Sequence, residues 1–125
     1  GGQAQFIERP ISRSTPNHNI NALLAYLNEN LTELHSTDSL AERLSMSRST
    51  FTRHFRKATG MSLNQWLIEA RLQRARELLE STDLSITDIA EQSGFHSDTA
   101  LRQHFLKKHK ISPNRWRKQF QIEDV

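Results

Sequence analysis

One side of a predicted helix over residues 48–59 carries basic and hydroxyl side chains. The residues that share this side are Arg48, Ser49, Thr52, Arg53 and Arg56. An arginine guanidinium holds its N–H donors in a rigid fork, which can bond to phosphate oxygens or to the O6 and N7 atoms of guanine. Protein surfaces usually intersperse both signs of charge, but this side has no acidic residue. For a lone helix a solvated charged surface would still be the preferred interpretation, so the case for an anionic ligand depends on whether such a side recurs.

A second predicted helix, over residues 98–109, presents a polar side at the corresponding place. Its outward residues are Asp98, Thr99, Arg102 and Gln103, and Lys107 and Lys108 follow toward the helix end. The opposite sides of both helices are apolar at helical spacing and should be buried. These inner residues are Phe51, Phe55 and Ala58 in the first helix, and Leu101 and Phe105 in the second. Each helix thus has one side for packing and one for binding.

Both helices belong to a unit that occurs twice in the sequence, about fifty residues apart. Leu40-Ala41-Glu42 recurs as Ile89-Ala90-Glu91, and Ser62-Leu63-Asn64-Gln65-Trp66 recurs as Ser112-Pro113-Asn114-Arg115-Trp116. Self-similarity of this kind indicates stacked supersecondary units, but two copies are too few for a solenoid. A tandem pair that engages two equivalent targets is the better interpretation.

Each unit is predicted to contain a short helix, a tight turn and a longer helix, which is the helix-turn-helix pattern. Serines are expected as the N-caps of these helices: Ser36 and Ser47 in the first unit, Ser85 and Ser97 in the second. Gly60 should end the first longer helix in a left-handed conformation. Ser62 and Gln65 form a capping box that opens a linker helix running to about Glu80, and Ser112-Pro113 opens the last helix.

A further amphipathic helix is predicted before the repeats. Its apolar stripe consists of Ile20, Leu23, Leu24, Leu27, Leu31 and Leu34. A coiled-coil seam could use the same stripe, but one short helix beside two helical repeats more often packs on their core. Residues 1–17 show no helical period and contain two of the three prolines. We interpret them as a linker or tail from a missing upstream domain.

The composition is that of a soluble protein whose repeats are basic. The 125 residues are 35% hydrophobic, with a net charge of +3. Residues 1–35 hold two Arg and three Glu, so the excess of basic residues falls in residues 36–125. No stretch approaches the roughly 18 apolar residues of a membrane span, and no signal peptide is recognisable. The absence of Cys excludes disulfides and thiolate metal sites.

No set of residues indicates catalysis, a cofactor or a metal. The sequence contains no Ser/His/Asp set, no carboxylate pair in a predicted pocket and no glycine-rich phosphate loop. The six His residues lack metal-site spacing, and His54 and His104, which are equivalent in the repeat, are expected beside the core or on phosphate. The equivalent Trp66 and Trp116 are expected as packing anchors, with base stacking as the alternative. The linker helix carries Arg71, Arg74 and Arg76 beside Glu69, Glu77 and Glu80, which predicts helix-surface or interdomain ion pairs, and Arg71 is expected to be structural.

Longer motifs within the repeats resemble those of a known family. They are Phe51-x-Arg53-x-Phe55, Arg71-Leu72-x-x-Ala75-x-x-Leu78-Leu79 and Ile89-Ala90-x-x-x-Gly94-Phe95. Residues 20–120 resemble the DNA-binding domain of the AraC/XylS family of bacterial transcription regulators. The resemblance implies an all-α fold of two helix-turn-helix subdomains joined by a long linker helix. It also implies which residues approach base edges: Ser49, Thr52 and Arg53 in the first recognition helix, and Asp98, Thr99, Arg102 and Gln103 in the second.

The sequence departs from the family pattern at several positions. Gln103 stands where many members have Arg, and Asp98 brings an acid to the outer surface, so the second unit should bind more weakly or read different bases. Leu63 replaces the usual proline at the start of the linker helix. Lys110 stands where the first copy has Gly60. A non-glycine residue in the left-handed conformation costs about 1 kcal/mol, so we expect this helix to end differently.

The predicted domain organisation follows the repeats. We expect a linker over residues 1–17, a first subdomain with the linker helix over 18–80, a second subdomain over 81–120, and a tail over 121–125. The opening Gly-Gly-Gln-Ala-Gln-Phe resembles the junction in family members with an upstream DJ-1/PfpI-type α/β domain. The chain is therefore expected to be the carboxy-terminal fragment of a larger regulator.

The function expected from these residues is sequence-specific binding of operator double-stranded DNA, without catalytic activity. A linker helix from Leu63 to Glu80 would span roughly 27 Å, so the two recognition helices could enter successive major grooves, ~34 Å apart. The fragment could bind as a monomer, while an upstream domain could dimerise the full protein. RNA polymerase is the expected protein partner. The expected location is the cytoplasm, on the nucleoid when DNA is bound, with no membrane association.

Two other functions would also explain the basic charge. A helical protein-interaction module could place its basic face on an acidic partner, but that does not account for two capped helices with polar faces in register. An architectural DNA binder without sequence preference would need only the Lys and Arg residues. Such a binder would not explain why the polar residues Thr52, Thr99 and Gln103 lie on the outer sides of the helices.

Overall fold

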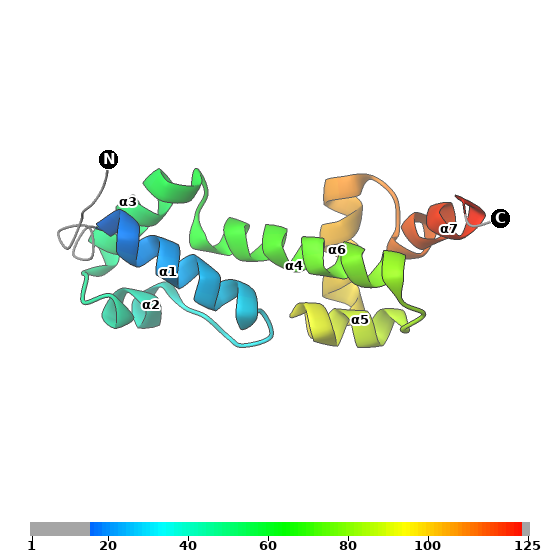
Figure 1. The fold of residues 1–125 in the computed structure, drawn as a ribbon, viewed down its shortest axis with the longest axis horizontal. Helices are drawn as coiled ribbons and strands as arrows, with labels where there is room; N and C mark the ends of the chain where they lie inside the picture. Colours follow the sequence, from blue (N-terminus) through cyan, green and yellow to red (C-terminus); the bar gives the residue numbers. More distant parts are fainter. Residues whose placement is uncertain (1–15, 124–125) are drawn as a thin grey trace, which may run out of the picture. The chain divides into compact units, whose positions relative to one another are not determined.

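The structure, a computed structural model, describes residues 16–123, and α-helices joined by turns and short loops make up this range. The helices are α1 (Pro16–Glu29), α2 (Thr37–Arg43), α3 (Arg48–Thr59), α4 (Leu63–Ser81), α5 (Ile86–Ser93), α6 (Asp98–His109) and α7 (Pro113–Glu123), as Figure 1 shows. This confirms the predicted all-α class. The proposed junction at residues 1–6 lies outside the described residues. No helix of the described range is long and apolar enough to cross a membrane.

The chain forms two compact units, and the division between them falls inside α4, after Trp66. The first unit contains α1, α2, α3 and the first turn of α4. The second contains the rest of α4 with α5, α6 and α7, and it also includes the short segment Leu31–Leu34. Each unit therefore holds one pair of helices in the helix-turn-helix arrangement.

Serine caps start the helices of both pairs, as expected from the sequence. The Ser36 hydroxyl accepts a hydrogen bond from the Ser39 amide at 3.0 Å, and Ser47 accepts from the Thr50 amide at 3.2 Å. The corresponding caps in the second unit are Ser85, which accepts from Asp88, and Ser97, which accepts from Ala100. These bonds satisfy amides that a helix leaves without an internal partner. They fix the first residue of each recognition helix.

The capping box before α4 is also confirmed. The Gln65 amide donates to the Ser62 hydroxyl at 3.2 Å, and the Ser62 amide donates to the Gln65 side-chain oxygen at 3.3 Å. This reciprocal pair begins the helix without the proline that the last helix has at Pro113.

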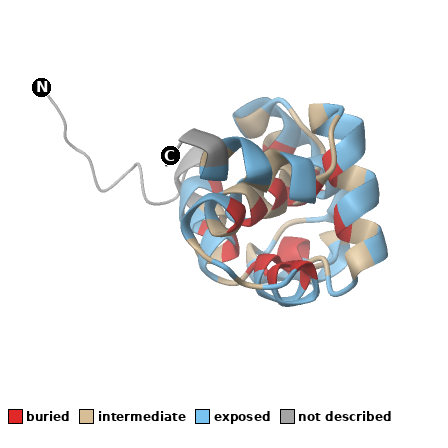
Figure 2. Cartoon of the chain, turned by 90° about the vertical axis from the view of Figure 1, so that its right-hand side faces the viewer, coloured by how far each residue is buried: buried red, intermediate tan, exposed pale blue. Residues whose placement is uncertain are grey.

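The core of the first unit forms around the inner side of α3. Phe51 and Phe55 are 1% exposed, with ring centroids 5.6 Å apart, and α1 and α2 both contact α3. Trp66 stands edge-on to Phe55 at 6.3 Å, which confirms its role as a packing anchor. Figure 2 shows the buried residues along the inner sides of the helices. Burial of these rings leaves the opposite side of α3 to face solvent.

The core of the second unit forms in the same way around α6. Leu101 and Phe105 are fully buried, together with residues of α4 and α5: Leu72, Ala75, Leu79, Ile86, Ile89 and Ala90. Trp116 packs edge-on against Phe105 at 5.6 Å, as Trp66 does against Phe55. The repeat in the sequence is therefore a repeat in packing.

Two predictions about buried faces were wrong. Ala58 is exposed, because the inner row of α3 runs through Phe51, Phe55 and the half-buried Thr59, at intervals of four residues. The apolar stripe of α1 was also too long: the helix ends at Glu29, and Leu34 is 93% exposed. Leu31 is buried, but it belongs to the second unit rather than to the helix.

The prediction that the helix before Lys110 ends differently from the helix before Gly60 was wrong. The backbone angles of Lys110, φ 69° and ψ 4°, match those of Gly60, φ 76° and ψ 5°. In both cases the amide of the cap residue bonds to the carbonyl four residues earlier, at Leu106 and Arg56 respectively. Lys110 thus ends its helix in the same left-handed conformation as Gly60, although this conformation costs energy for a residue with a side chain.

The segment Leu31–Leu34 is held on the second unit by polar contacts to its backbone. Arg71 of α4 donates to the carbonyls of Leu31 at 2.9 Å and Glu33 at 3.2 Å, and His96 Nε2 lies 2.9 Å from the Thr32 carbonyl. Arg71 is thus structural, as expected. It bonds to main-chain carbonyls rather than to a carboxylate in one of the predicted helix-surface or interdomain ion pairs. This anchors the chain between α1 and α2.

Candidate nucleic-acid interface

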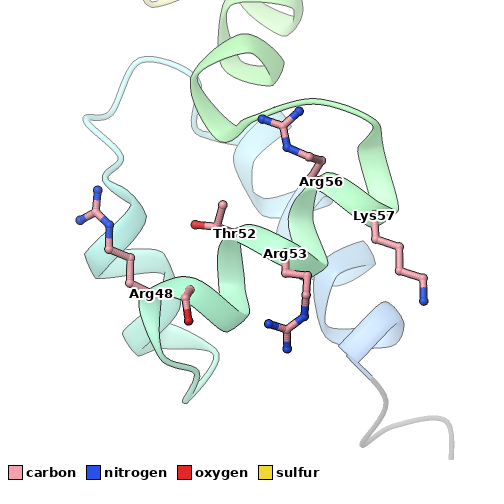
Figure 3. A pocket seen from close by; sticks show the side chains of 6 residues that line it. Arg48, Thr52, Arg53, Arg56 and Lys57 are labelled. Carbon is pink, nitrogen blue, oxygen red and sulfur yellow. The ribbon is translucent and has the colours of Figure 1, made fainter.

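The outer side of α3 gathers the predicted residues of the first unit on one surface. Arg48, Ser49, Thr52, Arg53 and Arg56 are all exposed. With Lys57 they line an open depression of about 650 Å³. Figure 3 shows the long Arg and Lys side chains extending away from the helix, with the shorter Thr52 between them. Helix α3 is capped at its start and packed on its inner side through buried phenylalanines. Its outer side therefore presents guanidinium, ammonium and hydroxyl donors at the spacing of a helix.

Residue Lys57 was missed by the sequence interpretation, although it lies on the same surface. Two signals could have found it. It follows Arg53 by four residues, which places both on one side of the helix. It is also the repeat equivalent of Lys107, which was included. Lys57 adds a fourth cation to the depression.

One cation of this surface already has a carboxylate partner. Arg48 Nη1 lies 2.8 Å from Asp38 Oδ1, and Asp38 belongs to α2. Both side chains are well exposed, at 67% and 72%, so this pair contributes little to stability. It does direct the Arg48 side chain toward α2. Arg53 and Arg56 are therefore the better-placed cations for a ligand on α3.

The outer side of α6 carries the predicted residues of the second unit. Thr99, Arg102 and Gln103 are exposed, and Asp98 is half-buried. Asp98 Oδ2 accepts a hydrogen bond from the Thr87 hydroxyl of α5 at 3.1 Å and lies 3.8 Å from Arg102 Nη2. The acid that departs from the family pattern is therefore engaged by neighbours on two helices.

The basic end of α6 contains one lysine that is paired within the unit. Lys107 and Lys108 are both exposed, but Lys108 Nζ lies 2.9 Å from Glu69 Oε1 of α4. Both lysines were predicted to contact DNA. The structure distinguishes them, because an anionic ligand would have to compete with Glu69 for Lys108.

The neighbours of the His109 imidazole, at the end of α6, favour its neutral form. Arg76 Nη1 lies 2.9 Å from His109 Nε2, so Nε2 accepts and Arg76 donates. The ring also packs 4.6 Å from Phe105 and 4.7 Å from Trp116. Partial burial lowers the pKa of His109, and the charges of Arg76 and Lys108 lower it further against the opposing influence of Glu69. This packing fixes the end of the recognition helix.

The described residues contain no group of three or more His, Asp or Glu that could hold a metal ion. His54 and His104 are half-buried, and His104 stacks on Phe95 with ring centroids 5.6 Å apart. The candidate interface is therefore a surface of hydrogen-bond donors on two capped helices. Fold and surface together define a tandem helix-turn-helix protein.

Comparison with known proteins gives the family. A model described as a helix-turn-helix domain matches residues 40–119. The chain is 32% identical over 104 residues to the Msm operon regulatory protein of Streptococcus mutans, covering 78% of this chain and 37% of that protein. It is 37% identical over 90 residues to the HTH-type transcriptional activator RhaS of Citrobacter koseri, covering 69% and 32%. The chain belongs to the AraC/XylS-type helix-turn-helix family.

Solved structures share the fold. The DNA-binding domain of AdpA, a global transcriptional factor solved in complex with a target DNA, matches with a TM-score of 0.80 and 38% identity, covering 84% of this chain and 95% of that one. The C-terminal domain of AraT, a response regulator from Geobacillus stearothermophilus, matches with a TM-score of 0.76 and 29% identity, covering 86% and 88%. By contrast, the chain spans only about a third of the length of its curated relatives.

Proposed function

We propose that this chain binds double-stranded DNA in a sequence-specific manner and thereby regulates transcription. The observation that carries the proposal is the outer side of α3, where exposed Arg and hydroxyl side chains stand opposite the buried Phe51 and Phe55. A helix of this kind fits the major groove of DNA, where each base pair presents its own pattern of donors and acceptors. The similarity to the AdpA domain, which was solved with its target DNA, supports this assignment.

Both units take part in the proposed binding. The polar residues of α3 and α6 occupy equivalent places in the repeat, and each helix starts at a serine cap. We assign Ser49, Thr52 and Arg53 to base contacts in one groove, and Thr99, Arg102 and Gln103 to base contacts in the next. Arg56, Lys57 and Lys107 are assigned to phosphate, which supplies affinity without sequence information.

The rest of the proposal concerns the longer protein. The residues before α1, which begins at Pro16 and so shortens the expected linker over residues 1–17, would connect an upstream domain. The DJ-1/PfpI type is our hypothesis for that domain. The full-length protein would act in the bacterial cytoplasm, on the nucleoid when bound, and would contact RNA polymerase. It would bind rather than catalyse. The fragment itself would bind DNA as a monomer, with the two subdomains reading one site.

Selection of bound sites from random double-stranded DNA tests the proposal. The parent chain should enrich a consensus, and Arg53→Ala should cost about 1 to 3 kcal/mol on that consensus while relaxing preference at one base pair. Arg74→Ala is the matched control, because it removes the same charge from an exposed position on α4. It should leave the preference unchanged.

Two outcomes would contradict the proposal. Equal weakening of Arg53→Ala on consensus and random DNA would reduce Arg53 to a phosphate contact. No enrichment of any site, together with binding to an acidic polypeptide, would favour a protein-interaction module.

A further inference from the structure

The first residue of each recognition helix is bonded to the preceding helix of its own unit. In the first unit Arg48 of α3 contacts Asp38 of α2 at 2.8 Å, and in the second unit Asp98 of α6 contacts Thr87 of α5 at 3.1 Å. Both pairs join the residue after the N-cap serine to the second residue after the preceding cap, so they occupy equivalent places in the repeat. The donor and acceptor are exchanged between them. The two contacts occupy the same place in the repeat but are made by different residue types. What they share is that each ties the first residue of a recognition helix to the preceding helix, which indicates a positioning role.

In the second unit this bridge extends to a third residue. The same oxygen of Asp98 that accepts from Thr87 lies 3.8 Å from Arg102 Nη2, one helical turn further along α6. Thr87, Asp98 and Arg102 thus form a continuous chain from α5 to the outer side of α6. A guanidinium has five N–H donors, and two suffice for guanine O6 and N7. The remaining donors leave Arg102 free to keep Asp98 while it contacts a base.

A carboxylate at this place is otherwise unfavourable in a DNA-binding surface. Unpaired, it would repel phosphate, and as a base reader it would have to accept from cytosine N4 or adenine N6, the amino donors of the major groove. In the structure its oxygen is already directed to two neighbours. Asp98 has therefore less freedom to reach a base than Thr99 or Gln103, which are exposed on the same helix.

We propose that Asp98 is a positioning residue that holds Arg102 in its base-reading direction, with Thr87 fixing the carboxylate, rather than a base reader itself. This rests on the proposed function, because Arg102 must read a base for its direction to matter. Both side chains remain partly exposed, 47% for Arg102 and 40% for Asp98. The effect should therefore appear in sequence preference rather than in stability.

A double-mutant cycle on the full 125-residue chain tests this, with a random double-stranded DNA library and the selected consensus as probes. Arg102→Ala should reduce discrimination at one base pair by roughly five- to a hundredfold. Asp98→Ala should reduce discrimination at the same base pair by about twofold, the size expected for a helix ion pair. In the Arg102→Ala background, Asp98→Ala should change nothing further. Melting curves check that each variant is folded.

Thr87 supplies the matched control pair. Thr87→Val removes the hydroxyl that donates to Asp98 and keeps the side-chain shape, so it should shift preference in the same direction as Asp98→Ala. Thr87→Ser keeps the hydroxyl and should behave as the parent. The proposed function assigns no DNA contact to Thr87 or to Asp98.

The experiment distinguishes failure of the Asp98 inference from failure of the proposed function. Loss of preference at a different base pair in Asp98→Ala, additive with Arg102→Ala, would make Asp98 a direct base reader and overturn the inference alone. Tighter binding to all sequences with unchanged preference would show that Asp98 only repels phosphate, and would also overturn it. If the parent chain enriches no consensus, the inference and the proposed function fall together.

Discussion

Replacement of Phe105 by Ala should unfold the second unit at a much lower temperature than the parent. Phe105 is 0% exposed and lies in one cluster with residues of α4 and α5. Its ring also packs against Trp116 at 5.6 Å and against His109 at 4.6 Å. The substitution removes all of these contacts and leaves a cavity among side chains of α4, α5 and α7.

The expected cost is roughly 3 to 5 kcal/mol, as for other Phe-to-Ala changes in cores. A small domain is stable by only about 5 to 15 kcal/mol, so this is a large share of the total. In a domain of this size each kcal/mol shifts Tm by about 4 to 8 °C. We therefore expect Tm to fall by at least about 12 °C, measured by circular dichroism and by guanidinium unfolding.

The adjacent residue is the matched control. Leu106 is 53% exposed, so Leu106→Ala should move Tm by no more than a few degrees. Equal shifts for the two variants, or a Phe105→Ala variant that melts like the parent, would show that the buried and exposed sides of α6 are assigned wrongly.

Three further predictions follow from particular contacts. Gly94 has φ +101°, and a Cβ there would overlap the Leu31 carbonyl, so Gly94→Ala should lower Tm clearly more than Gly60→Ala, whose Cβ would meet open space; equal effects would refute the close approach. Because the pKa of His109 is lowered on folding, its contribution to stability is complete above the unfolded pKa of about 6.5 and is lost as pH falls through the lower folded pKa. The decline in Tm on acidification should therefore be smaller in His109→Gln, and an identical decline would count against this. Lys107→Ala should reduce the slope of log affinity against log salt by about 0.9 and Lys108→Ala by less, since Lys108 is paired with Glu69; the reverse order would contradict the assignment.

Much of the local structure could be predicted from the sequence because capping is a local interaction. The serines that begin α2, α3, α5 and α6 bond to amides three residues away, so their types and spacing were sufficient. The aromatic anchors could be predicted because the repeat duplicates them. Phe55 with Trp66, and Phe105 with Trp116, form the same edge-on contact in each unit.

What could not be predicted depends on contacts between distant residues. Arg71 bonds to carbonyls 40 and 38 residues earlier, and the spacing of residues along the sequence does not indicate such contacts. The same holds for the bond from Thr87 to Asp98. The end of α1 was misjudged because Leu31 and Leu34 continue its apolar period, although neither lies in the helix. The exposure of Ala58 could have been expected from its equivalent in the repeat, Lys108, since a charged side chain at that place is rarely buried.

Hydroxyl-radical footprinting of the chain on its selected site tests directly whether α3 and α6 read two successive major grooves. We expect two protected segments separated by about one helical turn, ~10 base pairs. Arg53→Ala should weaken the protection in one segment and Arg102→Ala in the other. A single protected segment, or protection that does not depend on the DNA sequence, would show that the two helices do not read successive grooves.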